Sequence, residues 1–378
     1  MTDVVIAAYR RSPFHLANRG ELVKLRPDEM AAQVVKALLA DSGVDPATIE
    51  DLVVGCAFPE GEQGLNVAKL IGFIAGLPES VAGATVNRFC GSSMQSVHQA
   101  AGAIRMGAGE AFLCAGVESM SRVPMMGFNP MPHPGLVKDY PQALISMGET
   151  AENVARRYQV TRGEQEGFAV RSHAKATAAQ AAGKLTDEIV PLQVNGKTVA
   201  QDGCIRPDTS AEGLSGLKPA FRADGTVTAG TSSPLTDGAT AVLACSAEYA
   251  QRHGLTPLAR VKSIAVAGCA PEIMGMGPVE ATKKALARAG IAAKDLDVVE
   301  LNEAFASQAL ACMRELGIDE AKVNLDGGAI ALGHPLGATG ARITGKAAQL
   351  LRREGGRYAL ATQCIGGGQG IATVLEAV

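Results

Sequence analysis

The sequence predicts an α/β protein in which helices cover a mainly parallel sheet and one folding unit occurs twice. Runs rich in β-branched residues alternate with alanine-rich stretches of helical periodicity, and this alternation is typical of the class. It is present near both ends of the 378-residue chain. A chain of that length exceeds one ordinary hydrophobic core, so we expect two or three domains.

The first half contains five predicted elements. The strands are short runs dominated by aliphatic residues, and the helices are longer and carry apolar residues at a spacing of three to four. Glycine marks several helix ends. In chain order the elements are a strand at 3–9, a helix at 27–43, a strand at 50–58, a helix at 91–107 and a strand at 111–118.

The second half predicts a similar succession. A helix at 277–290 is followed by a strand at 296–305, and a later strand covers 358–364. Gly43 and Gly290 each end a helix, and an apolar residue opens a strand six positions after each glycine. We interpret the match as a duplicated α/β unit. The alternative is that βα units in general look alike.

The duplication has a consequence for where a site would form. The offset between the two glycines is 247 residues (290 − 43), and added to Cys90 it reaches Gly337, in the same glycine-rich stretch as His334. Ligands of open parallel sheets bind outside the carboxyl ends of the strands. If the halves pack about a pseudo-twofold axis, Cys90 and His334 meet in one crevice.

A region of different amino-acid composition separates the halves. Residues 120–142 are rich in Pro, Met and Gly and lack periodicity, so we expect a long functional loop there. A helical stretch and polar segments follow it. The resulting division assigns 1–117 plus about 237–257 to an N-terminal half, 118–236 to an inserted loop subdomain over the crevice, and 258–378 to a C-terminal half.

The composition excludes several classes of protein. The formal net charge is −3, so no basic field recruits nucleic acid or an anionic membrane surface. The first residues show no secretory pattern, and the longest apolar runs fall far short of the ~20 residues that span a bilayer. We therefore expect a cytoplasmic protein with no nucleic-acid or membrane partner.

The 8 cysteines are scattered, and no two form a Cys-x-x-Cys pair. Neither a zinc site nor a redox motif is indicated, and we expect no metal. In a reducing compartment the thiols stay free, and most act as small buried hydrophobic residues. This structural role is expected for Cys56, Cys114, Cys204, Cys245, Cys269 and Cys312.

Cys90 has a more specific context. It lies between an apolar run and a helix that opens with Gly-Ser-Ser. The free N–H groups and the dipole at a helix N-terminus stabilise a thiolate, and a turn from strand to helix presents a nucleophile at the top of a sheet. From these residues alone, a reactive thiol and a small core cysteine are equal alternatives.

His334 lies in a shaped loop before a predicted helix. Pro335 follows it, and four glycines flank it at positions 327, 328, 333 and 337. A histidine exposed to a ligand there can act as the general base that deprotonates a thiol. The alternative is a structural histidine that hydrogen-bonds to the backbone of the loop.

Two further positions follow predicted strands. Cys364 leads into four glycines within five residues (366–370), where the backbone can approach a ligand and N–H groups can bind an anion. The alternative is a phosphate-binding loop with an incidental cysteine, although no Walker Lys-Ser/Thr follows. Asn302 would hold a catalytic water, or it would cap a helix.

Five motifs occur in a characteristic order: VNRFCGSSMQ, TAGTSSPLTDGA, LNEAFA, NLDGGAIALGHPLGATGAR and CIGGGQG. Together they resemble the thiolases, the acetyl-CoA C-acyltransferases that cleave 3-ketoacyl-CoA with CoA or condense two acyl-CoA molecules. The resemblance covers essentially the whole chain. The residues of the segments NRFCGSSMQ and EIMGMGPV are most similar to those of the 3-ketoacyl-CoA thiolases of bacterial β-oxidation, and they are compatible with acetoacetyl-CoA thiolases.

The resemblance implies the thiolase fold, with two duplicated βαβαβ-type halves in five α-β-α-β-α layers and an inserted loop subdomain. It also implies the catalytic roles. Cys90 would carry the acyl group as a thioester, and His334 would activate it. The His334 ring nitrogen and a water held by Asn302 would form one oxyanion hole. Cys364 would move the proton at the α-carbon of acetyl-CoA, and the backbone N–H groups of Cys90 and Gly366 would form a second hole.

The resemblance further implies the coenzyme A contacts. Ser233 matches a serine near the pantetheine and Arg206 a position at the nucleotide end. Phe305 and Met147 match positions on the pocket wall. From the residues alone, the less favoured alternatives are that Arg206 forms a surface ion pair and that Met147 fills the core. CoA and acyl-CoA would be substrates, with no permanently bound cofactor, and the chain would be a homodimer or homotetramer or a subunit of a β-oxidation complex.

Three other classes of protein compete with this interpretation. Ketoacyl synthases and HMG-CoA synthase use one cysteine with other partners, and the second cysteine in CIGGGQG argues against them. A non-catalytic CoA- or lipid-binding protein of the same fold would lack one of Cys90, His334 and Cys364, but all three are present. A NAD-dependent dehydrogenase is disfavoured because no Gly-x-Gly-x-x-Gly follows an early strand.

Overall fold

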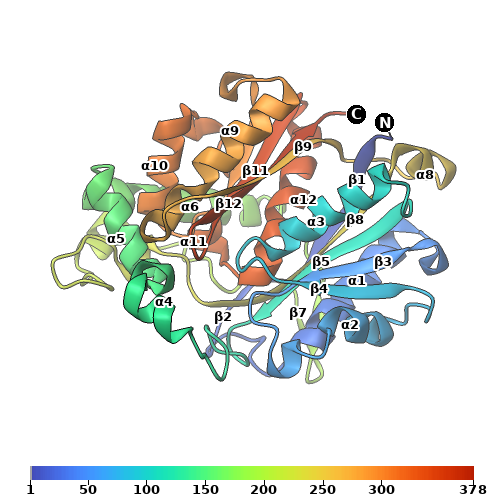
Figure 1. Ribbon diagram of the computed structural model, residues 1–378, viewed down its shortest axis with the longest axis horizontal. Coiled ribbons are helices and arrows are strands. Elements are labelled where there is room, and N and C mark those ends of the chain that lie inside the picture. The colour runs from blue at the N-terminus through green and yellow to red at the C-terminus, as the bar shows by residue number, and fades with distance from the viewer. Residues whose placement is uncertain (1) are drawn as a thin grey trace.

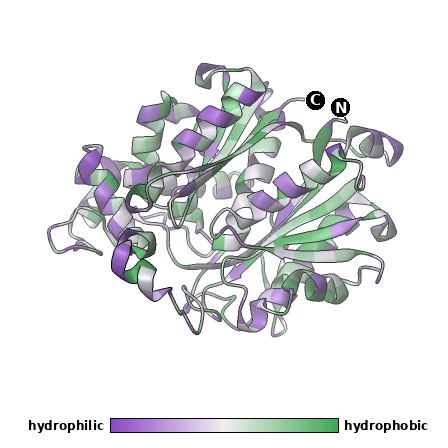
Figure 2. Cartoon of the chain, viewed as in Figure 1, coloured by the Kyte–Doolittle hydropathy of each residue, from purple (hydrophilic) through white to green (hydrophobic). Residues whose placement is uncertain are grey.

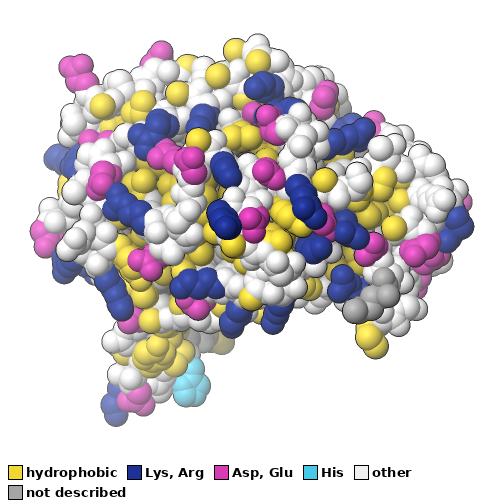
Figure 3. Space-filling model, turned by 90° about the horizontal axis from the view of Figure 1, so that it is seen from above, with side chains coloured by type: hydrophobic (Ala, Val, Ile, Leu, Met, Phe, Trp, Pro, Cys, Tyr) yellow, Lys and Arg dark blue, Asp and Glu magenta, His cyan; other side chains and the backbone are white. Residues whose placement is uncertain are grey.

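The computed structural model describes residues 2–378. Two related halves share one large sheet, and an insertion lies to one side of them (Figure 1). Within the described residues, no helix is long and apolar enough to cross a bilayer. Basic and acidic side chains are interspersed over the face seen in Figure 3, so neither sign of charge dominates it.

The N-terminal half supplies one side of the sheet. Its strands lie in the order β4-β3-β5-β8-β1, and the short β2 pairs with β8. The pairs β3–β4 and β3–β5 are parallel, whereas β5–β8 and β8–β1 are antiparallel. The bounds are β1 Val4–Arg11, β2 His15–Leu16, β3 Asp51–Gly55, β4 Ala82–Val86, β5 Ala111–Ser119 and β8 Thr236–Ser246.

The C-terminal half repeats this pairing. Its strands lie in the order β10-β11-β12-β9, with β10–β11 parallel and the next two pairs antiparallel. The halves join where β1 pairs with β9 through only two residue pairs, Val5 with Arg260 and Ile6 with Ala259. The bounds are β9 Ala259–Gly268, β10 Val298–Leu301, β11 Tyr358–Ile365 and β12 Gln369–Glu376.

The expectation of a mainly parallel sheet is wrong, because the sheet is mixed. Parallel strands need a long crossover, usually a helix, whereas a tight turn joins only antiparallel strands. The chain turns at once between β11 and β12, where Gly367 and Gly368 have φ values of +78° and +81°. The glycines that were noticed as a ligand-binding feature therefore also fix the direction of the last strand.

Helices fill three layers around the two halves of the sheet, which gives the five-layer α-β-α-β-α arrangement (Figure 1). Helices α1 and α2 cover the outer face of the N-terminal half, α9 and α10 cover that of the C-terminal half, and α3 and α12 pack together between them. The bounds are α1 Pro27–Ser42, α2 Val67–Ala75, α3 Ser92–Arg105, α9 Gly277–Ala289, α10 Ala306–Leu316 and α12 Leu336–Glu354. Two short helices complete the halves, α8 Ala247–Arg252 and α11 Ala329–Leu332.

Each helix layer has its own hydrophobic core. One cluster lies between α1, α2 and the first half of the sheet, a second between α9, α10 and the other half, and a third surrounds α3 and α12. The strands are predominantly apolar, and the outer helices alternate apolar and polar positions (Figure 2). The central helices approach closely, since a Cβ at Gly340 of α12 would clash with the backbone nitrogen of Met94 on α3.

The insertion runs between β5 and β8. It holds α5 and α6, which account for the predicted helical stretch, and a two-stranded sheet of β6 and β7. Residues 120–142, expected as a loop, are mostly irregular but include α4. The bounds are α4 Pro134–Asp139, α5 Met147–Arg157, α6 Arg162–Ala181, β6 Leu192–Val194, β7 Lys197–Val199 and α7 Ala211–Ser215.

Buried ion pairs tie this insertion to the core. The guanidinium of Arg11 on β1 is fully buried and donates to both carboxylate oxygens of Asp202 at 2.7 and 2.8 Å. Lys346 on α12, 2% exposed, lies 2.9 Å from Glu188 and 2.7 Å from Asp326. Because Glu188 and Asp202 belong to the insertion, these pairs connect three parts of the chain.

Candidate active site

Cys90 lies in the sharp connection between β4 and α3. Phe89, directly before it, has φ of +41°, a left-handed conformation that is strained for a bulky residue. The hydroxyl of Ser92 accepts from the Arg88 N–H and donates to the Phe89 carbonyl at 2.6 Å. The side-chain amide of Gln363 donates to the Cys90 carbonyl. The turn is thus held partly by its own helix and partly by the C-terminal half.

The surroundings of Cys90 favour a neutral thiol rather than a thiolate. Burial raises the pKa of Cys90 to about 11, and hydrogen bonds from the backbone N–H groups of Gly366 and of Cys90 itself oppose this effect only in part. Stabilisation of a thiolate by the helix N-terminus, expected from the sequence, is therefore outweighed by desolvation. A nucleophile in this state needs a base to remove its proton.

His334 lies between α11 and α12 and is 4% exposed. Its backbone N–H donates to the Thr236 hydroxyl at 3.0 Å, and its Nδ1 lies 2.6 Å from the Thr339 hydroxyl. Burial, with a smaller contribution from the Arg342 charge, lowers the pKa of His334 to about 3. The ring is accordingly a neutral imidazole at physiological pH, which is the form that can accept a proton.

Asn302 follows the end of β10. Its N–H donates to the Thr362 carbonyl at 3.0 Å, so the strand pairing with β11 fixes it. The side-chain Nδ2 lies 3.4 Å from Nε2 of His334, and its Oδ1 is buried without a protein partner. A buried oxygen of this kind usually binds a water. The helix cap suggested as an alternative does not form, because α10 begins only at Ala306.

Cys364 lies near the end of β11, opposite Gly370 of β12, and is 1% exposed. Burial raises its pKa well above the ordinary value, and a Cys90 thiolate would raise it further. The second cysteine therefore stays protonated until a neighbouring group takes its proton. Gly366 follows it in the turn to β12.

A cavity of about 250 Å³ brings three of these residues together, whereas Asn302 and Gly366 are outside its lining. Cys90 from the N-terminal half and His334 and Cys364 from the C-terminal half all line it, and its surface is mainly apolar. Its apolar lining consists of Met120, Met125, Met147, Phe221, Pro234, Leu235, Met274, Ala304, Phe305 and Leu336.

Three of the four residues matched to coenzyme A contacts line the same cavity, namely Ser233, Phe305 and Met147. The Ser233 N–H donates to the Ala304 carbonyl at 3.0 Å, and the Phe305 ring meets the Phe221 ring edge-on with centroids 5.9 Å apart. Arg206 is outside the cavity lining and exposed. Its backbone N–H donates to Nδ1 of His173, and its side chain has no ion pair among the described residues.

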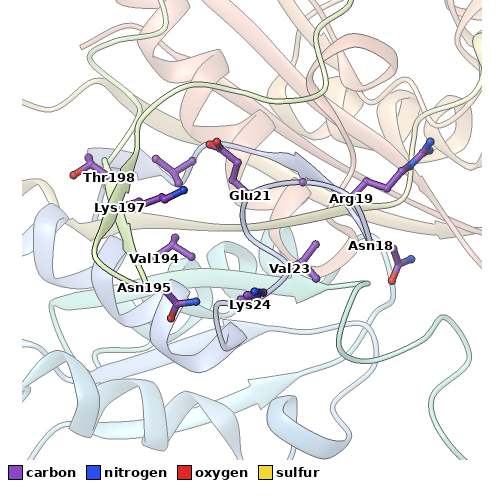
Figure 4. Close-up of a pocket in the computed structure, with 11 residues that line it drawn as sticks. Asn18, Arg19, Glu21, Val23, Lys24, Val194, Asn195, Lys197 and Thr198 are labelled. Carbon is purple, nitrogen blue, oxygen red and sulfur yellow. The ribbon is translucent and has the colours of Figure 1, made fainter.

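A larger cavity, of about 440 Å³, lies elsewhere (Figure 4). It separates residues 18–24 from the β6–β7 hairpin, and its charged lining residues are Arg19, Glu21, Lys24 and Lys197. None of the residues singled out from the sequence lines it. Size alone therefore does not identify the reactive centre of this molecule.

Known proteins share this architecture. The family model described as "Thiolase, N-terminal domain" matches residues 4–248, and "Thiolase, C-terminal domain" matches residues 255–377. The chain belongs to the thiolase family. It is 48% identical over 389 aligned positions to the 3-ketoacyl-CoA thiolase of Bacillus subtilis (strain 168) and 50% identical over 389 to that of Pseudoalteromonas translucida (strain TAC 125). Each alignment covers 100% of both chains.

A solved structure agrees in fold with this thiolase. The crystal structure of human mitochondrial 3-ketoacyl-CoA thiolase in complex with CoA superposes with a TM-score of 0.92 at 38% identity, covering 100% of this chain and 98% of that one. The five-layer, two-half architecture implied by the resemblance is thereby confirmed. The division into half, insertion and half at the residues given above stays a prediction.

The remaining cysteines of this thiolase contribute nothing to the cavity. Cys56, Cys114, Cys204, Cys245 and Cys312 are buried, whereas Cys269 is partly exposed. All eight cysteines, which fall within residues 2–378, are free. Those residues also contain no cluster of His, Cys, Asp or Glu able to hold a metal ion.

Sequence patterns did not point to Glu118, a fully buried carboxylate at the end of β5. Glu118 accepts from the Ala57 and Gly337 N–H groups at 2.8 Å each and from the Gln63 side chain at 2.8 Å. It thus joins the loop after β3 to the first turn of the helix that follows His334. The sequence feature that could have identified Glu118 is a carboxylate near the end of a nine-residue strand that is otherwise mainly apolar.

Proposed function

We propose that this protein catalyses reversible acyl transfer between a 3-ketoacyl-CoA and CoA, through an acyl thioester on Cys90. The observation that carries the proposal is the single apolar cavity lined by two thiols and one imidazole from opposite halves of the molecule. A cysteine that shares a cavity with a histidine base suits the making and breaking of a thioester.

In the thiolytic direction the first step is activation of Cys90. The S–H proton passes to Nε2 of His334, and the thiolate attacks the 3-keto carbon. Desolvation opposes this transfer, since both pKa shifts favour the neutral groups. The thiolate and imidazolium form as a pair, and their mutual attraction offsets part of that cost. Negative charge then develops on the keto oxygen, where Nε2–H and a water on Asn302 would stabilise it. Each such donor contributes about 3 kcal/mol.

The carbon–carbon bond breaks in the next step. Its electron pair passes to the departing acetyl-CoA enolate, and Cys364 supplies the proton to the α-carbon. The N–H groups of Cys90 and Gly366 would stabilise the thioester oxygen of the enolate, and the location of Gly366 N–H beside the Cys90 thiol supports this role. CoA then gives its S–H proton to the Cys364 thiolate and attacks the Cys90 thioester. This step releases the shortened acyl-CoA and a Cys90 thiolate, which takes its proton back from His334.

The CoA thioester is the substrate, and the proposal requires no resident cofactor. Ser233, Phe305 and Met147 would contact the pantetheine arm, which their place on the cavity wall supports. Arg206 would meet the nucleotide end, as an exposed cation outside the cavity lining. We also propose a cytoplasmic enzyme that assembles as a homodimer or homotetramer. The outer edge of β4, with Leu65 (88% exposed) and Phe73 (52% exposed) close by in sequence, supports assembly.

Two candidate substrates can be separated by experiment. The cavity lining includes Met120, Met125, Leu235 and Leu336, and Met120 and Leu336 share an apolar cluster with Cys90. Because flexible methionines adapt to an apolar occupant, this lining supports acyl chains longer than acetyl. Steady-state thiolysis of acetoacetyl-CoA and 3-ketooctanoyl-CoA should therefore give the higher kcat/KM for the longer substrate. The reverse order would identify an acetoacetyl-CoA thiolase. No turnover of either would leave a CoA-binding protein of the same fold.

Alkylation by iodoacetamide tests the activation of Cys90, and Cys269 is a matched control. Both thiols are partly exposed, and burial raises the pKa of each to about 11, but only Cys90 shares a cavity with a histidine. We expect Cys90 to react faster than Cys269 and the rate to fall to that of Cys269 in His334→Asn. Mass spectrometry of the labelled peptides gives both rates in one sample. Equal rates in the wild type would contradict the assignment of His334 as the base.

Cys364→Ala tests the division of labour between the cysteines. The acyl-enzyme should still form, because Cys90 and His334 are intact. Condensation of two acetyl-CoA molecules should be lost, because the variant lacks the base that removes the α-carbon proton. Transfer of radiolabelled acetyl to the protein and condensation measured side by side report the two steps. Equal loss of both activities would refute the separate role of Cys364.

A further inference from the structure

We infer that Thr339 is a positioning residue that fixes the tautomer of His334 and keeps Nε2 unprotonated. Thr339 lies on the first turn of α12, five residues after the histidine, and is 1% exposed. Its hydroxyl oxygen lies 2.6 Å from Nδ1 of His334, a short contact for a nitrogen–oxygen hydrogen bond. The inference rests on the proposed function, in which His334 is the base.

The direction of this hydrogen bond follows from counting protons. A hydroxyl has one proton to donate. The Thr339 hydroxyl donates it to the Pro335 carbonyl one helical turn earlier, with 3.0 Å between the two oxygens. With its proton committed there, Thr339 accepts from His334, so Nδ1 carries the hydrogen. In a neutral imidazole the other nitrogen is then the acceptor.

The opposite edge of the ring leads to the same tautomer. The amide Nδ2 of Asn302 lies 3.4 Å from Nε2, and a protonated Nε2 would set two donors against each other. Since Nδ1 faces Thr339, the Nε2 edge is the one available to the cavity that His334 shares with Cys90. The S–H bond of Cys90 can therefore break with its proton passing to Nε2, while Thr339 accepts from Nδ1–H throughout.

The hydrogen bond to Thr339 gains strength as the reaction proceeds. When Nε2 takes the Cys90 proton, the ring becomes an imidazolium, and its Nδ1–H bond becomes charge-assisted. The Thr339 oxygen then stabilises a charge that is absent from the resting enzyme. Interactions stronger in the transition state than in the ground state raise kcat rather than lower KM.

Thr339→Val tests this inference, with Thr339→Ser as the rescue variant. Valine keeps the shape but leaves Nδ1–H without an acceptor, so kcat for thiolysis should fall roughly 10- to 100-fold, the effect of one charge-assisted hydrogen bond, with KM little changed. Serine keeps the hydroxyl and should recover most of the rate. The alkylation rate of Cys90 should fall and recover in parallel, and this readout needs no acyl-CoA.

Thr344→Val is the matched control. Thr344 is buried on the same helix, and its hydroxyl donates to the Gly340 carbonyl at 2.7 Å, one turn earlier, but it contacts no histidine. This variant should keep the kcat and Cys90 alkylation rate of the wild type. Near-normal kcat in Thr339→Val, an equal loss in Thr344→Val, or failure of folded Thr339→Ser to recover would each overturn the inference. Should the valine variant not fold, Thr339→Ala takes its place with the same expectations.

The two readouts also separate this inference from the proposed function. If neither substrate is turned over while alkylation of Cys90 still depends on Thr339, the proposed function fails and the positioning role stands. If turnover is normal while alkylation is independent of Thr339, the proposed function stands and the positioning role is overturned.

Discussion

At the scale of single residues, the environment sets the chemistry more than residue type does. Cys90 and Cys269 have the same residue type and similarly raised pKa values, yet only Cys90 has an imidazole in its cavity. His334 and His98 are both buried, and burial lowers the pKa of each to about 3. His98, however, meets only the Thr373 hydroxyl, at 2.9 Å, and serves packing between α3 and β12.

His98 makes stability depend on pH. Its pKa falls from 6.5 to about 3 on folding, so between these values the unfolded chain binds a proton that the folded chain does not. Stability is thus fully present above pH 6.5 and is lost as pH falls, by about 1.4 kcal/mol per pH unit. His98→Gln retains a donor for Thr373 without titrating. Between pH 7 and pH 5 the wild type should lose about 2 kcal/mol more than the variant in urea unfolding. Parallel pH profiles would exclude a buried neutral His98.

At the scale of elements, the site depends on a few contacts that pull separate loops together. Glu118 gathers the loop after β3 and the first turn of α12, while Gln363 of β11 holds the carbonyl of Cys90. The strained φ of Phe89 persists because these contacts surround it.

Glu118→Gln should loosen this arrangement. Burial raises the pKa of Glu118, but all its partners are donors, so a carboxylate suits the position and a glutamine NH₂ would face N–H groups. Leaving buried donors unsatisfied costs roughly 1–3 kcal/mol for each group. We expect a lower melting temperature and slower alkylation of Cys90. Unchanged values in calorimetry and labelling would show that the loops hold their places without it.

Much of this could be predicted from the sequence. Alternating patterns predicted the strands β1, β3, β5, β10 and β11 and the helices α1, α3 and α9 within a few residues, but left β4, β8, β9 and β12 unassigned. Both Gly43 and Gly290 end helices in the left-handed conformation, with φ of +67° and +70°. Six of the residues singled out from the sequence line the cavity, whereas Asn302, Gly366 and Arg206 do not. The mixed pairing of the sheet was missed because antiparallel pairs such as β5–β8 and β1–β8 join strands that are far apart in the sequence. The tight turn between β11 and β12 accounts for one further antiparallel pair. Glu118 and Thr339 were missed because their roles arise from partners distant in sequence or from hydrogen-bond directions, which residue patterns do not encode.

At the scale of the whole molecule, buried charges link the insertion to the two halves. Lys346 of α12 meets Glu188 of the insertion and Asp326 of the C-terminal half, and Arg11 of β1 meets Asp202 of the insertion. Such pairs are weak evidence of net stability, but removing one partner leaves an uncompensated buried charge.

Lys346→Met should therefore destabilise the protein strongly. Glu188 and Asp326 would each lose one of two cationic partners, since Arg11 still pairs with Glu188 and Arg353 with Asp326. We therefore expect a cost toward the lower end of the roughly 3–5 kcal/mol typical of a broken buried pair. Lys283→Met is the control, because Lys283 pairs with Glu280 on an exposed helix face and should matter little. Denaturant unfolding of both variants gives the comparison. Equal stabilities would mean that water reaches the buried carboxylates.

The two repeats touch along the sheet at only two residue pairs, and the short stretch between α8 and β9 is what links them covalently. A cut there would leave one fragment with the attacking sulfur and the other with the imidazole and the second sulfur. Neither fragment alone would contain all three catalytic side chains, so we expect thiolase activity only when the two fragments are mixed. Acyl exchange in this molecule therefore requires both halves of the chain, folded against each other.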